Sequence, residues 1–321
     1  MIAVAHPVGL ELLIVSPESR SELGPLVPQP TRARSAAERR RAFFYAELQA
    51  PYYDAAADLN TPLFTLMQKT LFDLVRLHRA GVPPAEAERV FVVLDIGSGT
   101  GVESLPILRA FPSSRIVAFD LCEPMHDEFR RKACEEFGEA EVAARCQFVT
   151  GDIAEDAGAT LALSDYSAKW VPTRQYDIVI SSLTLHHLTT AEKRSVSQRV
   201  ASVLAPGGLF LNGDIFSYSS ASMAKAANDF GIEWIRRNFS DPPAELRKLK
   251  EALGDQAGPM GEAWVDHYVN YNLPDPIDSL GRSGAAGDPK NDQAQMLIDA
   301  GFSEVAVPFR FWEVGILWAK K

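Results

Sequence analysis

Cysteine is scarce in this sequence, and its scarcity excludes some classes of protein. The chain has 321 residues and three cysteines, at positions Cys122, Cys134 and Cys146. Three scattered cysteines are too few for a disulfide framework or for a zinc site. We therefore expect a reducing, cytoplasmic location for the protein.

Long apolar runs are also missing. No stretch approaches the roughly 20 apolar residues that a membrane helix needs, so we expect a soluble protein with no membrane partner. The amino-terminal MIAVAHPVGLELLIVS lacks a basic segment and is interrupted by His6, Pro7 and Glu11. It therefore does not predict a secretory signal.

Positive charge is in deficit as well. The chain has 42 acidic and 32 basic side chains, which gives a formal net charge of −10. A surface that binds DNA needs positive charge along the phosphates, so no DNA partner is expected. The arginine-rich stretch 31–49 is predicted to be helical, and its arginines form either a solvated face or a contact to phosphate or RNA.

The sequence does contain a regular alternation of short apolar runs and segments with helical spacing. Such an alternation predicts a parallel sheet with helices on both faces. Strands are predicted at 90–96, 115–120, 146–152, 176–185 and 207–216, and helices at 60–80, 100–110, 123–139 and 190–204. Asn60 or Thr61 is predicted to cap the first of these helices. A closing helix, NDQAQMLIDAGF, and two strands, EVAVPF and WEVGILWAK, are expected to complete the sheet with an antiparallel pair.

The alternation stops between residues 217 and 288. Helical segments there carry several aromatic side chains, directly after the end of a predicted strand, where open α/β sheets bind ligands. We interpret this stretch as a helical lid. The expected organisation is an amino-terminal extension with helices (1–88), an α/β core (89–216 and 289–321) and the lid insertion (217–288).

The stretch VFVVLDIGSGTGVES, residues 90–104, places Gly97, Gly99 and Gly101 after a predicted buried strand. It lacks the G-x-G-x-x-G spacing of dinucleotide sites and the lysine of a phosphate loop. Asp120 closes the second strand, where an acid can bind both ribose hydroxyls of an adenosine. Asp152 closes the third strand and offers a carboxylate to an adenine amine.

Five motifs in this order and spacing resemble the class I S-adenosylmethionine-dependent methyltransferase family, in its small-molecule type with a lid. They are VLDIGSGTG, VAFDLCEPM, FVTGDI, YDIVISSLTLHHL and VLAPGGLFL, and the resemblance covers roughly residues 89–216. It implies a Rossmann-like α/β fold, with a seven-stranded, mostly parallel sheet and an antiparallel last strand. It also implies S-adenosyl-L-methionine as the cofactor. The cofactor contacts expected from the resemblance are Asp95, Gly97, Ser98, Gly99, Gly101, Asp120, Leu121, Met125, Asp152, Ile153 and Ser181.

Methyl transfer is an in-line displacement at a carbon that is already activated, so alignment and exclusion of water are the main requirements. His186 and His187 follow the fourth strand and are the catalytic candidates, either as a base or as residues that orient the site. Ser181 and Ser182 stand where a metal-dependent enzyme would have an acid, so no catalytic metal is expected. Asp214, after the fifth strand, is the one carboxylate that could still serve as a metal ligand at this site.

The acceptor is expected to be a small molecule, as in secondary metabolism, enclosed by the lid and methylated on oxygen, nitrogen or carbon. Candidate contacts to it are Tyr52, Tyr53, Trp234, Trp264, His267 and Tyr268. Two other functions remain open: a carboxy-S-adenosylmethionine synthase of tRNA wobble modification, and a catalytically idle cofactor-binding partner protein. A homodimer is also open.

Overall fold

The computed structural model describes residues 50–82, 89–154, 166–167, 170, 175–188, 190–216, 221–258, 261–262, 264–265 and 293–321. The predicted arginine-rich helix at 31–49, the acceptor candidates His267 and Tyr268, and part of the predicted lid lie outside these residues. Among the helices of the described ranges, none combines the length and apolarity that a membrane crossing requires.

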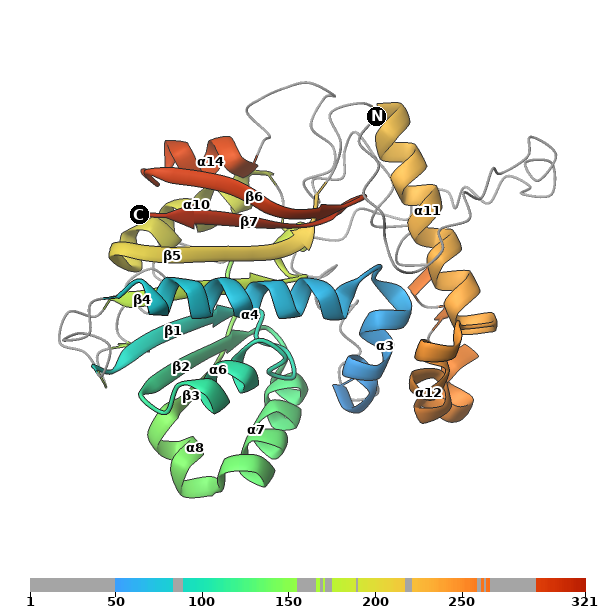
Figure 1. The fold of residues 1–321 in the computed structure, drawn as a ribbon, viewed down its shortest axis with the longest axis horizontal. Helices are drawn as coiled ribbons and strands as arrows, with labels where there is room; N and C mark the ends of the chain where they lie inside the picture. The colour runs from blue at the N-terminus through green and yellow to red at the C-terminus, as the bar shows by residue number, and fades with distance from the viewer. Residues whose placement is uncertain are drawn as a thin grey trace. The chain divides into compact units, whose positions relative to one another are not determined.

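A seven-stranded sheet forms the centre of the fold, in the order β3-β2-β1-β4-β5-β7-β6 (Figure 1). Its strands are β1 (Phe91–Ile96), β2 (Ser114–Asp120), β3 (Cys146–Thr150), β4 (Tyr176–Ser182), β5 (Leu204–Ile215), β6 (Glu304–Phe311) and β7 (Val314–Lys320). The first five strands pair in parallel, and β7 pairs antiparallel with both β5 and β6. The predicted Rossmann-like fold is therefore confirmed.

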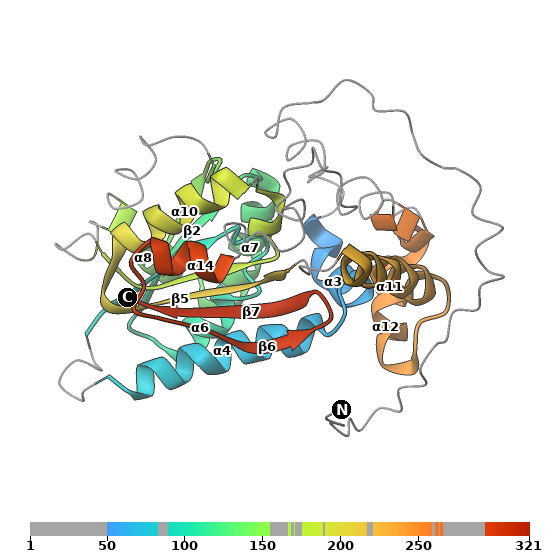
Figure 2. The same ribbon diagram turned by 90° about the horizontal axis from the view of Figure 1, so that it is seen from above.

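Both faces of the sheet are buried, which explains why the inner strands read as unbroken apolar runs. Alternate residues of β1 belong to different cores: Phe91 and Val93 to one, Val92 and Leu94 to the other. The first core is covered by α4 (Phe64–Ala80), α6 (Ser104–Ala110), α7 (Glu123–Phe137) and α8 (Glu139–Arg145). The second is covered by α10 (Thr190–Val203) and α14 (Gln293–Asp299). Figure 2 shows α4 on one side of the sheet and α10 with α14 on the other.

The predicted cap of the 60–80 helix is wrong. Asn60 is the last residue of a separate helix, α3 (Tyr53–Asn60), and α4 begins after Leu63, which has a positive φ of 57° and provides no side-chain cap. The carboxylate of Asp58 takes the role of the cap instead. It accepts hydrogen bonds from the Thr65 backbone N–H at 2.9 Å and from the Thr65 hydroxyl at 2.5 Å.

A group of helices lies beyond the carboxyl ends of the parallel strands (Figure 1). It consists of η2 (Ala50–Tyr52), α3, α11 (Ala221–Ser240), α12 (Ala244–Leu253) and η4 (Gly254–Gln256). Ala56 and Leu59 of α3 pack in one core with Ile235, Phe239 and Leu253 of α11 and α12. The short amino-terminal helix α3 therefore packs with two helices of the predicted lid, although more than 150 residues separate them in the sequence.

Candidate functional site

A cavity lies at the carboxyl ends of β1, β2, β3 and β4. At this place β2 and β3 continue the sheet on one side of β1, and β4 and β5 continue it on the other. Its lining residues are Tyr53, Gly97, Gly99, Phe119, Asp120, Leu121, Met125, Gly151, Asp152, Ile153, Ser182, Leu183, Thr184, His187 and Leu188. This edge of an open α/β sheet is where ligands bind in such folds. The structure thus brings seven of the predicted cofactor residues to one cavity, together with His187 and Tyr53.

The glycine loop is shaped by positions at which only glycine fits. Gly97 has a φ of 71°, and a Cβ added there would lie 1.9 Å from Oγ1 of Thr184. Gly101 has a φ of 84°, and a Cβ there would lie 2.4 Å from the Phe129 ring. Gly97 therefore lets the end of β4 approach the loop, whereas Gly101 lets α7 pack against it, away from the cavity lining.

Asp120 links the glycine loop to the end of β2. Its Oδ2 accepts from the Gly99 N–H and its Oδ1 from the Cys122 N–H, both at 2.8 Å. The side chain is 8% exposed. Burial raises the pKa of Asp120 to about 6, although these N–H groups act in the opposite direction. Asp152, at the end of β3, accepts from the Ala154 N–H at 2.8 Å.

Three predicted cofactor residues lie behind the cavity wall. Asp95 is fully buried and accepts from the Ser104 hydroxyl at 2.6 Å. Ser98 is buried with its hydroxyl 3.2 Å from Nε2 of His126. The hydroxyl of Ser181 donates to the Ile96 carbonyl at 2.9 Å, and its neighbour Ser182 lines the cavity in its place.

Sequence reasoning missed a buried polar cluster next to Ser182. Glu103 follows the glycine motif, and its carboxylate is bonded by Ser182 and by Gln68 of α4. Gln68 Nε2 also donates to the Ser182 hydroxyl at 2.7 Å. Burial raises the pKa of Glu103, and burial with the nearby Glu103 charge raises that of Asp95 well above its usual range. The only signal in the sequence was an acid two positions after Gly101.

The two histidines occupy different environments on η3 (Leu185–His187). His187 lines the cavity, whereas the Nδ1 of His186 lies 2.6 Å from Oδ1 of Asp214. The two imidazole rings are in contact, with centroids 3.8 Å apart and a tilt of 46° between their planes. Within the described ranges, no group of three or more His, Cys, Asp or Glu side chains is placed to hold a metal ion. The prediction that no metal is used stays a prediction.

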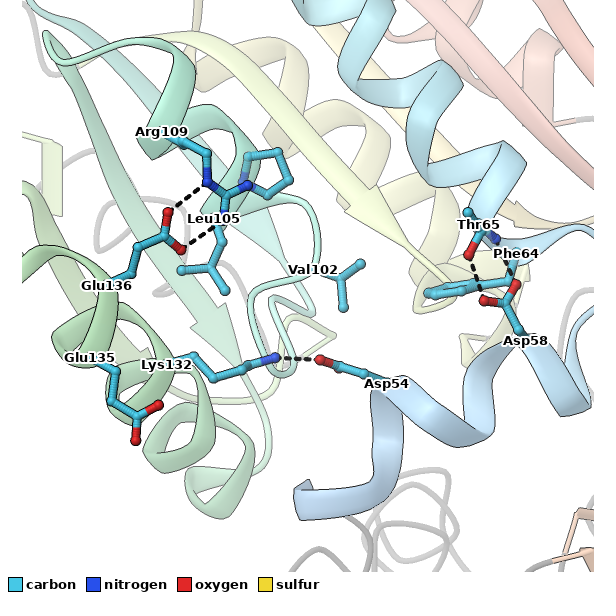
Figure 3. A pocket seen from close by; sticks show the side chains of 11 residues that line it. Asp54, Asp58, Phe64, Thr65, Val102, Leu105, Arg109, Lys132, Glu135 and Glu136 are labelled. Atoms are coloured by element: carbon cyan, nitrogen blue, oxygen red, sulfur yellow. Dashed lines mark hydrogen bonds and ion pairs between the residues drawn. The ribbon is translucent and has the colours of Figure 1, made fainter. Parts of the chain in front are cut away.

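Tyr53 and Asp54 connect α3 to the cavity. Tyr53 packs against Met125 and Cys122, and burial together with the charges of Glu103, Asp54, Asp120 and Asp214 raises the pKa of its phenol. The carboxylate of Asp54 accepts from the hydroxyl of Thr100 in the glycine loop and pairs with Lys132 of α7 at 2.6 Å. Figure 3 shows this ion pair crossing an open groove of about 600 Å³ between α3, α6 and α7.

The other acceptor candidates within the described residues, Tyr52, Trp234 and Trp264, pack in the helical group and do not line the cavity. Tyr52 and Trp264 pack on the core that α3, α11 and α12 share. Trp234 packs against Phe230 with ring centroids 6.1 Å apart, and Phe230 stacks on Trp312 of the β6–β7 turn at 4.9 Å. These side chains hold the lid helices together and to the hairpin. A contact to the acceptor stays a prediction for all three.

The charged side chains among the described residues that line the cavity are acidic, and the buried Arg199 reaches its wall through a hydrogen bond to the Ile153 carbonyl. Asp120 and Asp152 line it, and Asp95, Glu103 and Asp214 lie directly behind its walls. No lysine or arginine is among the described residues that line it. One carboxylate oxygen, Oδ1 of Asp95, is buried without a hydrogen-bond partner among the described residues. The cavity therefore presents buried acceptors and negative charge to any ligand.

Comparison with known proteins agrees with this geometry. Residues 93–208 match the family of methyltransferase domains. This match shows a methyltransferase domain over residues 93–208, and the strand order agrees with the fold that the sequence motifs predicted.

The curated relatives that the chain resembles are malonyl-[acyl-carrier protein] O-methyltransferases. One, from Ilyobacter polytropus, is 29% identical over 190 residues, which are 58% of this chain and 62% of that protein. Another, from Chlorobium phaeovibrioides, is 33% identical over 148 residues, 45% of each protein. The chain thus spans less than two thirds of the length of these relatives.

Among solved structures, magnesium protoporphyrin IX methyltransferase from Synechocystis PCC 6803 with bound S-adenosylmethionine is similar in fold. It is 17% identical, the match covers 91% of this chain and 100% of that chain, and the TM-score is 0.49.

Proposed function

We propose that the protein transfers the methyl group of S-adenosyl-L-methionine to a small-molecule acceptor that the lid helices enclose. The observation that carries this proposal is the charge of the cavity. S-adenosylmethionine carries a sulfonium and an ammonium group against one carboxylate, and its ammonium group would lie toward Asp95 and Glu103. A dinucleotide would instead bring phosphates next to Asp120 and Asp152, which would repel them.

The residues around the cavity fit this cofactor. The raised pKa values of Asp95 and Glu103 reflect the cost of burying carboxylates without a cation, and an ammonium group would lower that cost. The unpartnered Oδ1 of Asp95 is an acceptor that such a donor would satisfy. When bound, the sulfonium supplies a methyl carbon activated for in-line displacement.

The remaining roles follow from the position of each residue at the end of its strand. Asp120, with Leu121 beside it, would accept from the ribose hydroxyls. Asp152 would accept from the adenine amine, and Met125 and Ile153 would cover the adenine faces. Gly97, Ser98, Gly99 and Gly101 would let the backbone lie against the amino-acid part, with Ser182 in the place predicted for Ser181. His187 would contact the reacting groups from the end of β4.

A second candidate concerns the acceptor. The names of the curated relatives favour O-methylation of a carboxylate on an acyl group bound to a carrier. A carboxylate is already deprotonated at neutral pH, so its methylation would need no base and His187 would serve to orient it. For a phenol or alcohol acceptor, His187 would take the proton.

Titration calorimetry tests the cofactor assignment. The wild-type protein should bind S-adenosylmethionine and S-adenosylhomocysteine and should not bind NAD. Tight NAD binding, or no binding of either sulfur compound, would contradict the proposal. Release of S-adenosylhomocysteine over a panel of malonyl thioesters, phenols and amines then identifies the acceptor class. Addition of prephenate followed by mass spectrometry distinguishes a carboxy-S-adenosylmethionine synthase from a methyltransferase, because only the synthase would yield a carboxylated cofactor.

A further inference from the structure

Asp214 is a fully buried carboxylate at the carboxyl end of β5. It accepts three hydrogen bonds: from the backbone N–H of His186 at 3.0 Å, from the backbone N–H of Ile215 at 2.9 Å, and from Nδ1 of His186 at 2.6 Å. Because both oxygens are engaged by N–H donors, Asp214 is built to hold a neighbouring segment. That segment is η3, which carries both candidate histidines.

The turn before η3 is under backbone strain, so it needs such an anchor. Leu183 has a φ of 45°, a conformation that side chains with a Cβ rarely adopt. Its N–H donates to the Gly213 carbonyl of β5 at 2.8 Å, one residue before Asp214. The turn is therefore fastened to β5 at two adjacent positions. It is also pressed against the glycine loop, because Thr184 occupies the space next to Gly97.

The position of His187 follows from this anchor. An ionised carboxylate can only accept, so the proton of the His186 imidazole that faces Asp214 lies on Nδ1. The ring of His187 packs against that of His186 at an interplanar angle of 46°, and His187 lines the cavity. Asp214 thus fixes the His186 ring, and the His186 ring supports that of His187.

We propose that Asp214 is a positioning residue for methyl transfer, which holds η3 and the His186 ring so that His187 faces the reacting groups. The effect of Asp214 on methyl transfer rests on the proposed function. The hydrogen bonds by which Asp214 holds η3 do not depend on that function and are tested separately.

The first test is nitrogen-15 NMR of the histidines, of which the chain has six. In the wild type, His186 should be protonated on Nδ1, and S-adenosylhomocysteine should shift the His187 signals. In Asp214→Asn, the fixed tautomer of His186 should be lost, and the ligand-induced shift of His187 should fall at least twofold. Affinity for S-adenosylhomocysteine should stay within about threefold, because Asp214 does not line the cavity.

Asp177 offers a matched control. It is also buried and accepts from the Val92 N–H at 2.8 Å and from Arg89, but it stands at the start of β4, at the opposite edge of the sheet. Asp177→Asn should lower the melting temperature and leave the His186 and His187 signals unchanged. Should Asp214→Asn fail to fold, His186→Asn and His186→Leu both remove the ring that supports His187, so both should reduce its ligand-induced shift, and an unchanged shift in either folded variant would overturn the proposed path from Asp214 to His187.

The outcomes separate the two proposals. A wild-type His186 protonated on Nε2 alone, or an unchanged His187 response in folded Asp214→Asn, would overturn the role of Asp214. Absence of any ligand-induced shift in the wild type would instead count against the proposed function. With an acceptor identified, Asp214→Asn should lower kcat at least tenfold with little change in the cofactor KM. In a His187→Ala background, it should lower kcat no further.

Discussion

Asp120→Asn should remove a pH-dependent cost to the stability of the ligand-free protein and should weaken cofactor binding, because the carboxylate of Asp120 is held in an unfavourable environment. The side chain is buried, and its pKa in the folded protein is about 6, against 3.8 for an ordinary Asp. The folded protein therefore binds a proton more tightly than the unfolded chain. Its stability falls as the pH rises from about 4 to about 6, and above that range the whole cost is present.

The size of this cost follows from the two pKa values. Their difference of about two pH units, at roughly 1.36 kcal/mol per unit, gives on the order of 3 kcal/mol at pH 7. Asparagine carries no charge, but its amide nitrogen cannot accept one of the two N–H hydrogen bonds that the carboxylate receives, and this loss is similar at every pH. We therefore expect the stability of Asp120→Asn relative to the wild type to rise by up to about 3 kcal/mol between pH 4 and pH 7, as the wild type acquires the cost of the buried charge.

The same substitution should weaken the binding of the cofactor. A ribose hydroxyl would lose a charged acceptor, and hydrogen bonds to charged groups contribute about 1.5–3 kcal/mol. At about 1.4 kcal/mol per tenfold change, the dissociation constant should rise by roughly 10- to 150-fold. Calorimetry with S-adenosylhomocysteine measures this, and differential scanning calorimetry across pH 4–8 measures stability. Asp127→Asn, an exposed residue of α7 paired with Arg130, is the control and should change neither quantity.

Two results would refute this reasoning. A stability difference between Asp120→Asn and the wild type that does not change between pH 4 and pH 7 would show that the Gly99 and Cys122 N–H groups stabilise the charge as much as burial destabilises it. An unchanged affinity in a folded variant would remove Asp120 from the cofactor site.

Three further predictions concern metal, lid and cofactor exchange. Turnover should survive EDTA, because His186 and Ile215 already occupy the oxygens of Asp214; a loss that magnesium reverses would contradict this. Trp234→Ala and Trp264→Ala should each lower acceptor turnover tenfold or more, while calorimetry finds little change in cofactor affinity. A drop in melting temperature would identify the tryptophan that mainly stabilises the packing of the lid helices, since burial of such a side chain contributes about 1.5–3 kcal/mol. If neither changes turnover in a folded protein, the lid is not the acceptor site. Asp54→Asn or Lys132→Met should speed dissociation of S-adenosylhomocysteine by about two- to fivefold in stopped flow, the scale of an exposed ion pair; Arg131→Met is the control, because its ion pairs to Glu128 and Glu135 stay within α7.

The sheet was predictable from the sequence because its inner strands are buried on both faces and are bounded by glycines and acids. The strand ends that carry Asp120 and Asp152 were therefore placed correctly at the cavity. The choice between Ser181 and Ser182 was not predictable, because adjacent residues of a strand point to opposite faces and a shift of one residue exchanges them. The sequence alone did not indicate which of the two would face the cavity.

Long-range contacts account for the other differences. Asp214 and His186 are 28 positions apart, and their hydrogen bond depends on the pairing of β4 with β5. The start of α4 is fixed by Asp58 from the preceding helix, whereas propensity favoured a local cap at Asn60 or Thr61. Trp234 and Trp264 were predicted to contact the acceptor, which stays a prediction; in the structure Trp234 packs against Phe230 of its own helix, and Trp264 packs on the core of α3, α11 and α12.

Helix α3 has eight residues, and it contributes Tyr53 to the cavity and Ala56 and Leu59 to the core of α11 and α12. So short a helix cannot withdraw its first turn without disturbing its second. Departure of the spent cofactor would therefore require the same displacement that opens the acceptor side. Both products would then leave through one gating event and appear in solution at a single rate. The enzyme would complete each turnover by reopening as a whole, with no release of the cofactor while the acceptor stays enclosed.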